Sequence, residues 1–157
     1  MENLTGYERT CRMLKREPAD RIGVYEHFWS DTYKHYATQG HIKPGESYEG
    51  HFNLDIVECW PFNAVADLDF KNETVEEGED TILVRDGNGA LLRRHKHHDT
   101  TPEHVGFAVK SKKEWDEVRE KLLWPDERRI NFESYRKAKQ FAKEKQKFFT
   151  WSSPNVF

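Results

Sequence analysis

Three short apolar runs, each followed at once by polar or aromatic side chains, constrain the fold of this chain most strongly. They lie at Ile22–Glu26, Leu54–Trp60 and Phe148–Trp151. Short runs rich in Ile, Val and Phe are typical of buried β-strands. Helical patterns separate the runs, and strands that alternate with helices form parallel sheets. We therefore predict an α/β fold built on about three parallel strands.

Capping signals mark the helices between these strands. Thr5 precedes Glu8 by three residues, and Ser111 precedes Glu114 by the same distance. At this spacing a hydroxyl and a carboxylate satisfy two backbone amides at a helix start. Asn131 stands before a further helical pattern and can cap it in the same way. The pattern predicts one helix near the N-terminus and two in the C-terminal third.

The periodicity changes between the second and third predicted strands. From Asp67 to Val109 the chain shows short β-type runs, with Asp86–Gly89 (Asp-Gly-Asn-Gly) between two of them. Gly and Asn tolerate the positive φ that a tight hairpin requires. We predict a small antiparallel insertion of two or three strands at residues 67–109, within a single domain spanning residues 1–157.

Composition excludes several classes of function. The chain has 157 residues and a net charge of −3, and its charged residues, 34 % of the total, are of both signs and interspersed. No basic face for nucleic acid or membrane follows from this pattern. No apolar run approaches a spanning helix, and the N-terminus lacks a signal-peptide pattern. Cys11 and Cys59 have no metal-ligand spacing, so we expect a reduced, cytoplasmic protein.

The ends of the predicted strands carry the candidate site. Ligands of parallel α/β folds bind at the carboxyl ends of strands. After the first strand come Glu26, a candidate proton acceptor or cation partner, and His27, a candidate proton carrier. The end of the second strand presents Glu58. The candidate ligand contacts are Trp29, Trp60, Phe62, His97, Trp151 and Asn155. The alternative is a loop whose aromatic side chains only pack on the scaffold.

A histidine-rich segment suggests metal binding at first sight. His95, His97 and His98 fall within four positions. On a strand, however, His95 and His97 share a face while His98 points away, and the flanking cationic side chains repel a dication. We therefore predict no metal ligands here. We expect a solvated basic loop that binds an anion or covers the candidate site at the strand ends.

Five segments resemble the N-terminal part of the uroporphyrinogen decarboxylase superfamily, most closely its divergent, decarboxylase-like branch. They are Thr5–Arg9, Pro18–Val24, Asn53–Ile56, Thr101–His104 and Phe149–Asn155. The resemblance spans essentially the whole chain and implies a (β/α)8 barrel of the TIM type. Such a barrel needs at least about 200 residues. The resemblance therefore implies an incomplete barrel, the N-terminal part of a longer enzyme.

The same family includes the tetrapyrrole decarboxylase and methyltransferases that move methyl groups between corrinoid carriers and thiols or other acceptors. The decarboxylase holds its substrate's carboxylates with two arginines after the first strand, where this chain reads Tyr25–Tyr33 without an arginine. It also has a Ser-Asp pair after its second strand, whose Asp holds pyrrole N–H groups. Here Trp60–Phe62 occupies that neighbourhood. The resemblance thus favours a methyltransferase-type parent over classical tetrapyrrole decarboxylation.

Cofactors and partners follow from the resemblance as expectations. A complete parent would use zinc and a corrinoid, but neither Cys11 nor Cys59 stands in the family's zinc motif, so we expect no cofactor in this chain. We expect a small-molecule, tetrapyrrole or corrinoid ligand. An open sheet edge would allow a homodimer or a complementing polypeptide. An enzyme fragment, a decarboxylase-related lyase, a non-catalytic ligand-binding or self-associating remnant, and a small free-standing domain all stay open.

Overall fold

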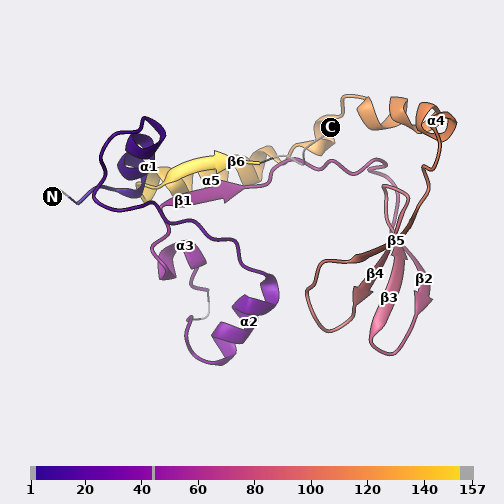
Figure 1. The fold of residues 1–157 in the computed structure, drawn as a ribbon, viewed down its shortest axis with the longest axis horizontal. Coiled ribbons are helices and arrows are strands. Elements are labelled where there is room, and N and C mark those ends of the chain that lie inside the picture. The colour runs from indigo at the N-terminus through magenta and orange to yellow at the C-terminus, as the bar shows by residue number, and fades with distance from the viewer. Residues whose placement is uncertain (1–2, 44, 153–157) are drawn as a thin grey trace. The chain divides into compact units, whose positions relative to one another are not determined.

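The computed structural model describes residues 3–43 and 45–152. The chain forms two compact units, shown in Figure 1. Unit 1 comprises Met1–Asn63 and Ile130–Phe157, and unit 2 comprises Ala64–Arg129. Unit 2 contains the predicted insertion at residues 67–109 and extends beyond it on both sides. Each unit is described below by itself.

A parallel pair of strands forms the sheet of unit 1. Strand β1, Ile56–Cys59, pairs with β6, Phe148–Trp151, and the two arrows run side by side in Figure 1. The register places Ile56 opposite Phe148 and Cys59 opposite Trp151. Two of the predicted strands and their parallel direction are therefore confirmed, although β1 is shorter than the predicted run of residues 54–60.

The prediction of a third strand at Ile22–Glu26 is wrong, because this segment has no strand assignment. One backbone hydrogen bond joins it to the start of β1, from the amide of Asp55 to the carbonyl of Val24 at 2.8 Å. Side chains bond several of its other polar groups. The amide of Val24 donates to the Asp55 carboxylate at 2.8 Å, and Arg21 donates to the carbonyl of Ile22. A strand ladder would need those same groups, so the expected run of barrel strands is not formed.

Among the residues that the structure describes, unit 1 also contains four helices: α1 (Gly6–Leu14), α2 (Ser30–Thr38), α3 (Tyr48–His51) and α5 (Phe132–Glu144). The capping box predicted at the start of α1 is confirmed, with Thr5 and Glu8 bonding each other's backbone amides. The predicted cap of α5 is confirmed as well, since Asn131 accepts a hydrogen bond from the amide of Ser134.

Helix α5 covers one face of the small sheet. Val57 and Cys59 are buried, and the Cys59 sulfur lies 3.6 Å from the hydroxyl of Ser134 in α5. The ring of Phe149 meets Tyr135 of α5 edge-on at 5.3 Å. Because side chains alternate along a strand, the intervening positions of β1 face away from α5. This alternation decides where the polar side chains of β1 lie.

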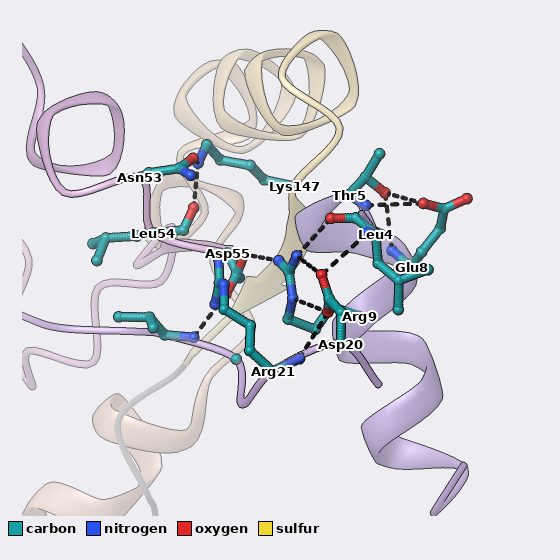
Figure 2. Close-up of polar contacts among 12 residues, drawn as sticks. Leu4, Thr5, Glu8, Arg9, Asp20, Arg21, Asn53, Leu54, Asp55 and Lys147 are labelled. Carbon is teal, nitrogen blue, oxygen red and sulfur yellow. Dashed lines mark hydrogen bonds and ion pairs between the residues drawn. The ribbon is translucent and has the colours of Figure 1, made fainter. Parts of the chain in front are cut away.

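A buried ion network fastens the N-terminal segments to the start of β1 (Figure 2). Arg9 is only 5 % exposed and Asp55 only 2 %. The Arg9 guanidinium bonds Asp20 at 2.7 Å and Asp55 at 2.5 Å, and Arg21 bonds Asp55 at 2.6 Å. Burial of such charges is tolerated only when they are paired and hydrogen-bonded. The network therefore holds α1 and the residue 20–24 segment against β1.

Aromatic side chains form a second cluster around α2 and α3. Phe28 stacks on Tyr48 at 4.3 Å and on Phe52 at 5.3 Å, and Tyr33 meets Tyr48 edge-on at 5.1 Å. Ring contacts of this kind add to the free energy gained from burial alone. They join the two short helices, whose backbones make few bonds with each other.

Unit 2 is built on an antiparallel sheet in the order β2-β3-β4-β5 (Figure 1). Its elements are β2 (Glu73–Glu77), β3 (Thr81–Arg85), β4 (Ala90–His95), β5 (Glu103–Phe107), α4 (Lys112–Leu123) and a 3-10 turn at Glu127–Arg129. The predicted antiparallel insertion is confirmed, with four strands in place of two or three. Sequence reasoning missed β5 because its pattern, Glu-His-Val-Gly-Phe, contains a glycine and no buried residue.

The turn between β3 and β4 is the predicted hairpin. The Asp86 carboxylate accepts from the amides of Asn88 and Ala90, each at 2.9 Å. Gly89 has a φ of 71°, and a Cβ there would approach the Cβ of Ala108 to 2.6 Å. Only glycine fits both the backbone conformation and this close approach.

Candidate active site at the carboxyl ends of β1 and β6

Glu58 occupies the centre of the candidate site. It lies between Val57 and Cys59, both of which face α5, so its side chain projects from the opposite face of β1. Thr150 is its partner in the register, and Ser152 follows two positions later on the same side of β6. The carboxyl ends of the two parallel strands therefore bring an acid and a hydroxyl together.

Three side chains donate hydrogen bonds to the Glu58 carboxylate. The Tyr25 hydroxyl donates to Oε2 and the Ser152 hydroxyl to Oε1. The Trp60 side chain also donates to this carboxylate, and the imidazole of His27 lies close enough to act on it electrostatically. A carboxylate has about four acceptor positions, so Glu58 keeps capacity for a donor from a ligand.

These contacts fix the charge state of the site. Burial raises the pKa of Glu58, but the hydrogen bonds from Ser152, Tyr25 and Trp60, together with His27, outweigh it and lower the net pKa. Burial and the bond to Glu58 raise the pKa of Tyr25 to about 12. At neutral pH the site therefore holds an ionised carboxylate beside a protonated phenol. An ionised acid of this kind accepts hydrogen bonds and attracts cations, and is a weak general base.

Two of the predicted site residues, His27 and Trp60, lie beside Glu58. The Glu26 carboxylate accepts from the amide of His27 at 2.9 Å. Trp29 is the N-cap residue of α2 and is 51 % exposed. The catalytic roles predicted for Glu26 and His27 stay predictions.

The remaining predicted contacts are not among the side chains that act on Glu58. Phe62 forms an isolated antiparallel bridge with Ile130. Trp151 is the partner of Cys59 in the register and so belongs to the α5 face of the sheet. His97 belongs to unit 2, in the loop after β4, where its amide donates to His95 at 3.0 Å. Asn155 lies outside the described residues.

The sequence prediction placed Glu58 at a strand end but gave it no role, and it did not select Tyr25 or Ser152. Glu58 carries a usable signal, since a charged residue between two apolar ones in a strand must point away from the covering helix. The same alternation puts Trp60 beside it and Trp151 on the other face. Ser152 follows from the register of β6 with β1, which a sequence alone does not specify.

Metal binding receives no support from the part of the chain that the structure describes. In residues 3–43 and 45–152, no group of three His, Cys, Asp or Glu side chains is arranged to hold an ion. Cys11 and Cys59 are both free thiols. In the same residues, no helix is long and apolar enough to cross a membrane.

Comparisons of the chain with protein-family models, with curated proteins and with solved structures found no match. Fold and site therefore define the class of protein by themselves. It is a mixed α/β protein with a parallel strand pair and a four-stranded antiparallel sheet. An ionised carboxylate, held by a phenol and a hydroxyl, lies at the carboxyl end of the parallel pair.

Proposed function

We propose that unit 1 binds a small organic ligand at Glu58, as part of a divergent enzyme of the uroporphyrinogen decarboxylase type. The Glu58 carboxylate, held by the Tyr25 and Ser152 hydroxyls with acceptor capacity left over, is the observation that carries this proposal. Trp60 adds an indole that is 58 % exposed on the same face. An ionised acid next to an exposed indole suits a ligand with a positive charge or with N–H donors.

The sequence resemblance narrows the ligand class to tetrapyrroles and corrinoids. Pyrrole N–H groups are donors that a carboxylate such as Glu58 accepts. The polycarboxylate periphery of uroporphyrinogen, in contrast, would be repelled by about 1 kcal/mol or more for each close acid in a partly desolvated pocket. Glu58 and Glu26 are both acids near this site. The proposal therefore favours methyltransferase-type chemistry and an absence of uroporphyrinogen turnover.

The described residues do not fit the zinc of such a methyltransferase. Cys59 is buried against Ser134, and the other thiol, Cys11, is in α1. The contribution proposed for this chain is therefore limited to ligand binding and to proton transfer through His27. Two free thiols fit a reducing compartment, and we propose the cytoplasm.

Glu58→Gln should weaken ligand binding about tenfold or more. A hydrogen bond to a charged group is worth about 1.5–3 kcal/mol, and glutamine removes the charge while keeping the shape. Binding is measured by quenching of tryptophan fluorescence with hydroxocobalamin as the probe. Uroporphyrin, whose peripheral carboxylates the Glu58 charge repels, is the comparison probe and should bind the wild type more weakly. Glu26→Gln is the matched control and should stay within about twofold of the wild type.

This experiment compares the contributions of Glu58 and Glu26 to ligand binding. A larger effect of Glu26→Gln would move the site to the loop after residue 25. Failure of both probes to bind would refute the tetrapyrrole and corrinoid ligand class. Measurable decarboxylation of uroporphyrinogen by the wild-type chain would refute the favoured chemistry.

A second candidate function is association with another polypeptide, and we propose a second copy of this chain. Within the described residues, β1 is the sole strand paired with β6. The amides of Phe148 and Ser152 bond toward β1, so the intervening amides of Phe149 and Trp151 point to the outer edge. Open edges of this kind pair with other strands.

Trp151→Lys should abolish self-association, so that the particle mass in solution falls to that of a monomer. Trp151 is 56 % exposed at the end of β6, and a lysine there would put two like charges together in a paired edge. Trp29→Lys is the control, because Trp29 is similarly exposed, at 51 %, but caps α2. Light scattering over a range of concentrations measures the mass. A monomeric wild type at every concentration would rule out this association.

A further inference from the structure

A small polar pocket lies at the amino ends of β1 and β6, the opposite end of the sheet from Glu58. Its volume is about 170 Å³. Pockets for drug-sized ligands measure roughly 300–1,000 Å³, so this one suits a small ion or a single polar group. Four cationic side chains line it: Arg9, Arg21, Lys145 and Lys147. They come from α1, from the segment before Ile22 and from the chain between α5 and β6.

The acids around the pocket do not balance these four cations. Asp55 is the one carboxylate among the lining residues, and it already pairs with both Arg9 and Arg21. Asp20 pairs with Arg9 from outside the lining. Neither Lys145 nor Lys147 has a carboxylate within ion-pair distance in the described part of the chain. The four positive charges thus face two paired acids, and a net positive charge remains.

Lys147 shows the imbalance most clearly. Its ammonium donates to the carbonyl of Leu54 and lies 3.5 Å from the side-chain oxygen of Asn53, both of which are neutral acceptors (Figure 2). Burial lowers the pKa of Lys147, although Asp55 and Glu49 counteract this from a longer range. A partly buried ammonium without an anionic partner is unfavourable. An anion in the pocket would remove that cost.

The start of α1 adds to the positive potential. Thr5 and Gly6 line the pocket, and Gly6 is the first residue of the helix. Helix N-termini carry a partial positive charge, which favours anions. The capping box and the carbonyl of Gln146 already take the amides of Thr5, Glu8 and Tyr7, so the contribution of α1 is this charge and not a set of free amides. A Cβ on Gly6 would approach the carbonyl oxygen of Asp55 to 2.9 Å, so glycine allows the helix start to lie this close to β1.

We propose that this pocket binds a dianionic oxyanion, either inorganic phosphate or the phosphate group of a monoester. A doubly charged oxyanion neutralises the excess positive charge and accepts from several ammonium and guanidinium donors at once. The pocket and Glu58 lie at opposite ends of β1, so the binding of this anion is independent of the ligand proposed for Glu58.

Calorimetric titration of the full chain tests the proposal. The probes are sodium phosphate and glycerol 3-phosphate, with sodium chloride keeping the ionic strength constant. We expect saturable binding of at least one of them. Tighter binding of glycerol 3-phosphate would identify the phosphate group of an organic ligand, and tighter binding of phosphate would identify the free ion.

Substitutions of the two lysines locate the site. Lys147→Gln should weaken binding about tenfold or more, and Lys145→Gln a few-fold, because Lys145 is exposed at the C-cap of α5. Lys143→Gln, which removes the same charge from α5 outside the pocket, should stay within about twofold. Since Lys145 is exposed, its variant tests the site even if Lys147→Gln is unstable. The proposal is overturned if neither probe binds, if both pocket variants bind like the wild type, or if Lys143→Gln loses as much affinity.

Discussion

Replacing Asp55 with asparagine is expected to lower the free energy of unfolding by about 3–5 kcal/mol, the usual cost of removing one partner from a buried ion pair. The Asp55 side chain accepts from Arg9, from Arg21 and from the amide of Val24. An asparagine amide would turn a donor toward donors and would leave Arg9, only 5 % exposed, without half of its counter-charge. Urea titration followed by tryptophan fluorescence measures the loss.

Asp69→Asn is the matched control for this substitution. Asp69 also bonds an arginine, Arg128, at 2.7 Å, but its side chain is 77 % exposed. Exposed ion pairs contribute about 0–1 kcal/mol, so this variant should unfold close to the wild type. Equal effects of the two substitutions would mean that burial does not strengthen the Asp55 network.

The same network should make the protein sensitive to acid. Burial raises the pKa of Asp55, but the bonds from Arg21 and Val24 and the charges of Arg21 and Arg9 lower it overall, and Arg9 lowers the pKa of Asp20. A carboxyl whose pKa is lowered by folding stabilises the folded state above its unfolded pKa, about 3.9, and loses that contribution as the pH falls through the folded pKa. Stability should therefore fall below about pH 4, and less steeply in Asp55→Asn.

Local signals in the sequence predicted local structure well. The Thr5–Glu8 capping box, the Asn131 cap and the Asp86–Gly89 hairpin each depend on side chains within a few residues of the backbone that they bond. Such contacts survive in almost any tertiary context, since the donors and acceptors lie next to each other in the chain. The two strands with the most apolar sequences were found for a related reason, because their side chains must be buried.

The failed strand at Ile22–Glu26 has the opposite cause. Its apolar residues, among them Ile22 at 75 % exposed, are typical of a strand, but an aspartate more than thirty residues away decides its backbone bonds. Asp55 bonds the Val24 amide because of where β1 lies in the fold. The residues around Val24 carry no information about that position. The burial of Arg9 could not be predicted for the same reason. In the sequence it is one of several basic residues of a helix and has the pattern of an exposed side chain.

The sequence prediction placed the candidate site at the carboxyl ends of the parallel strands and selected two of the residues that lie beside Glu58. His27 and Trp60 were selected for chemistry and for their positions after strands, and both lie near Glu58. Glu58 itself, Tyr25 and Ser152 come together only through the β1–β6 register and the path of the residue 22–25 segment. The ends of the strands, which can be predicted from sequence, thus indicate where the site lies. The residues that meet there depend on long-range strand pairing.

Replacing Ile42 with alanine is expected to cost about 2–5 kcal/mol, the range for removing a buried Ile, Leu or Met side chain and leaving a cavity. Ile42 is 1 % exposed and is the largest fully buried side chain among the described residues. It lies four residues after the end of α2, and its amide donates to the carbonyl of Tyr36 at 3.4 Å. Ile22→Ala makes the same chemical change at a side chain that is 75 % exposed, and should stay within about 0.5 kcal/mol.

This pair of variants decides whether residues 28–52 unfold together with the sheet of unit 1. Short helices such as α2 and α3 are not stable alone in water, so they depend on the stacked rings of Phe28, Tyr48 and Phe52 and on the buried Ile42. If these side chains belong to the cooperative core, the urea midpoint of Ile42→Ala must fall while its m-value stays constant. A midpoint equal to that of Ile22→Ala would show instead that residues 28–52 open locally, at a lower free energy than the sheet.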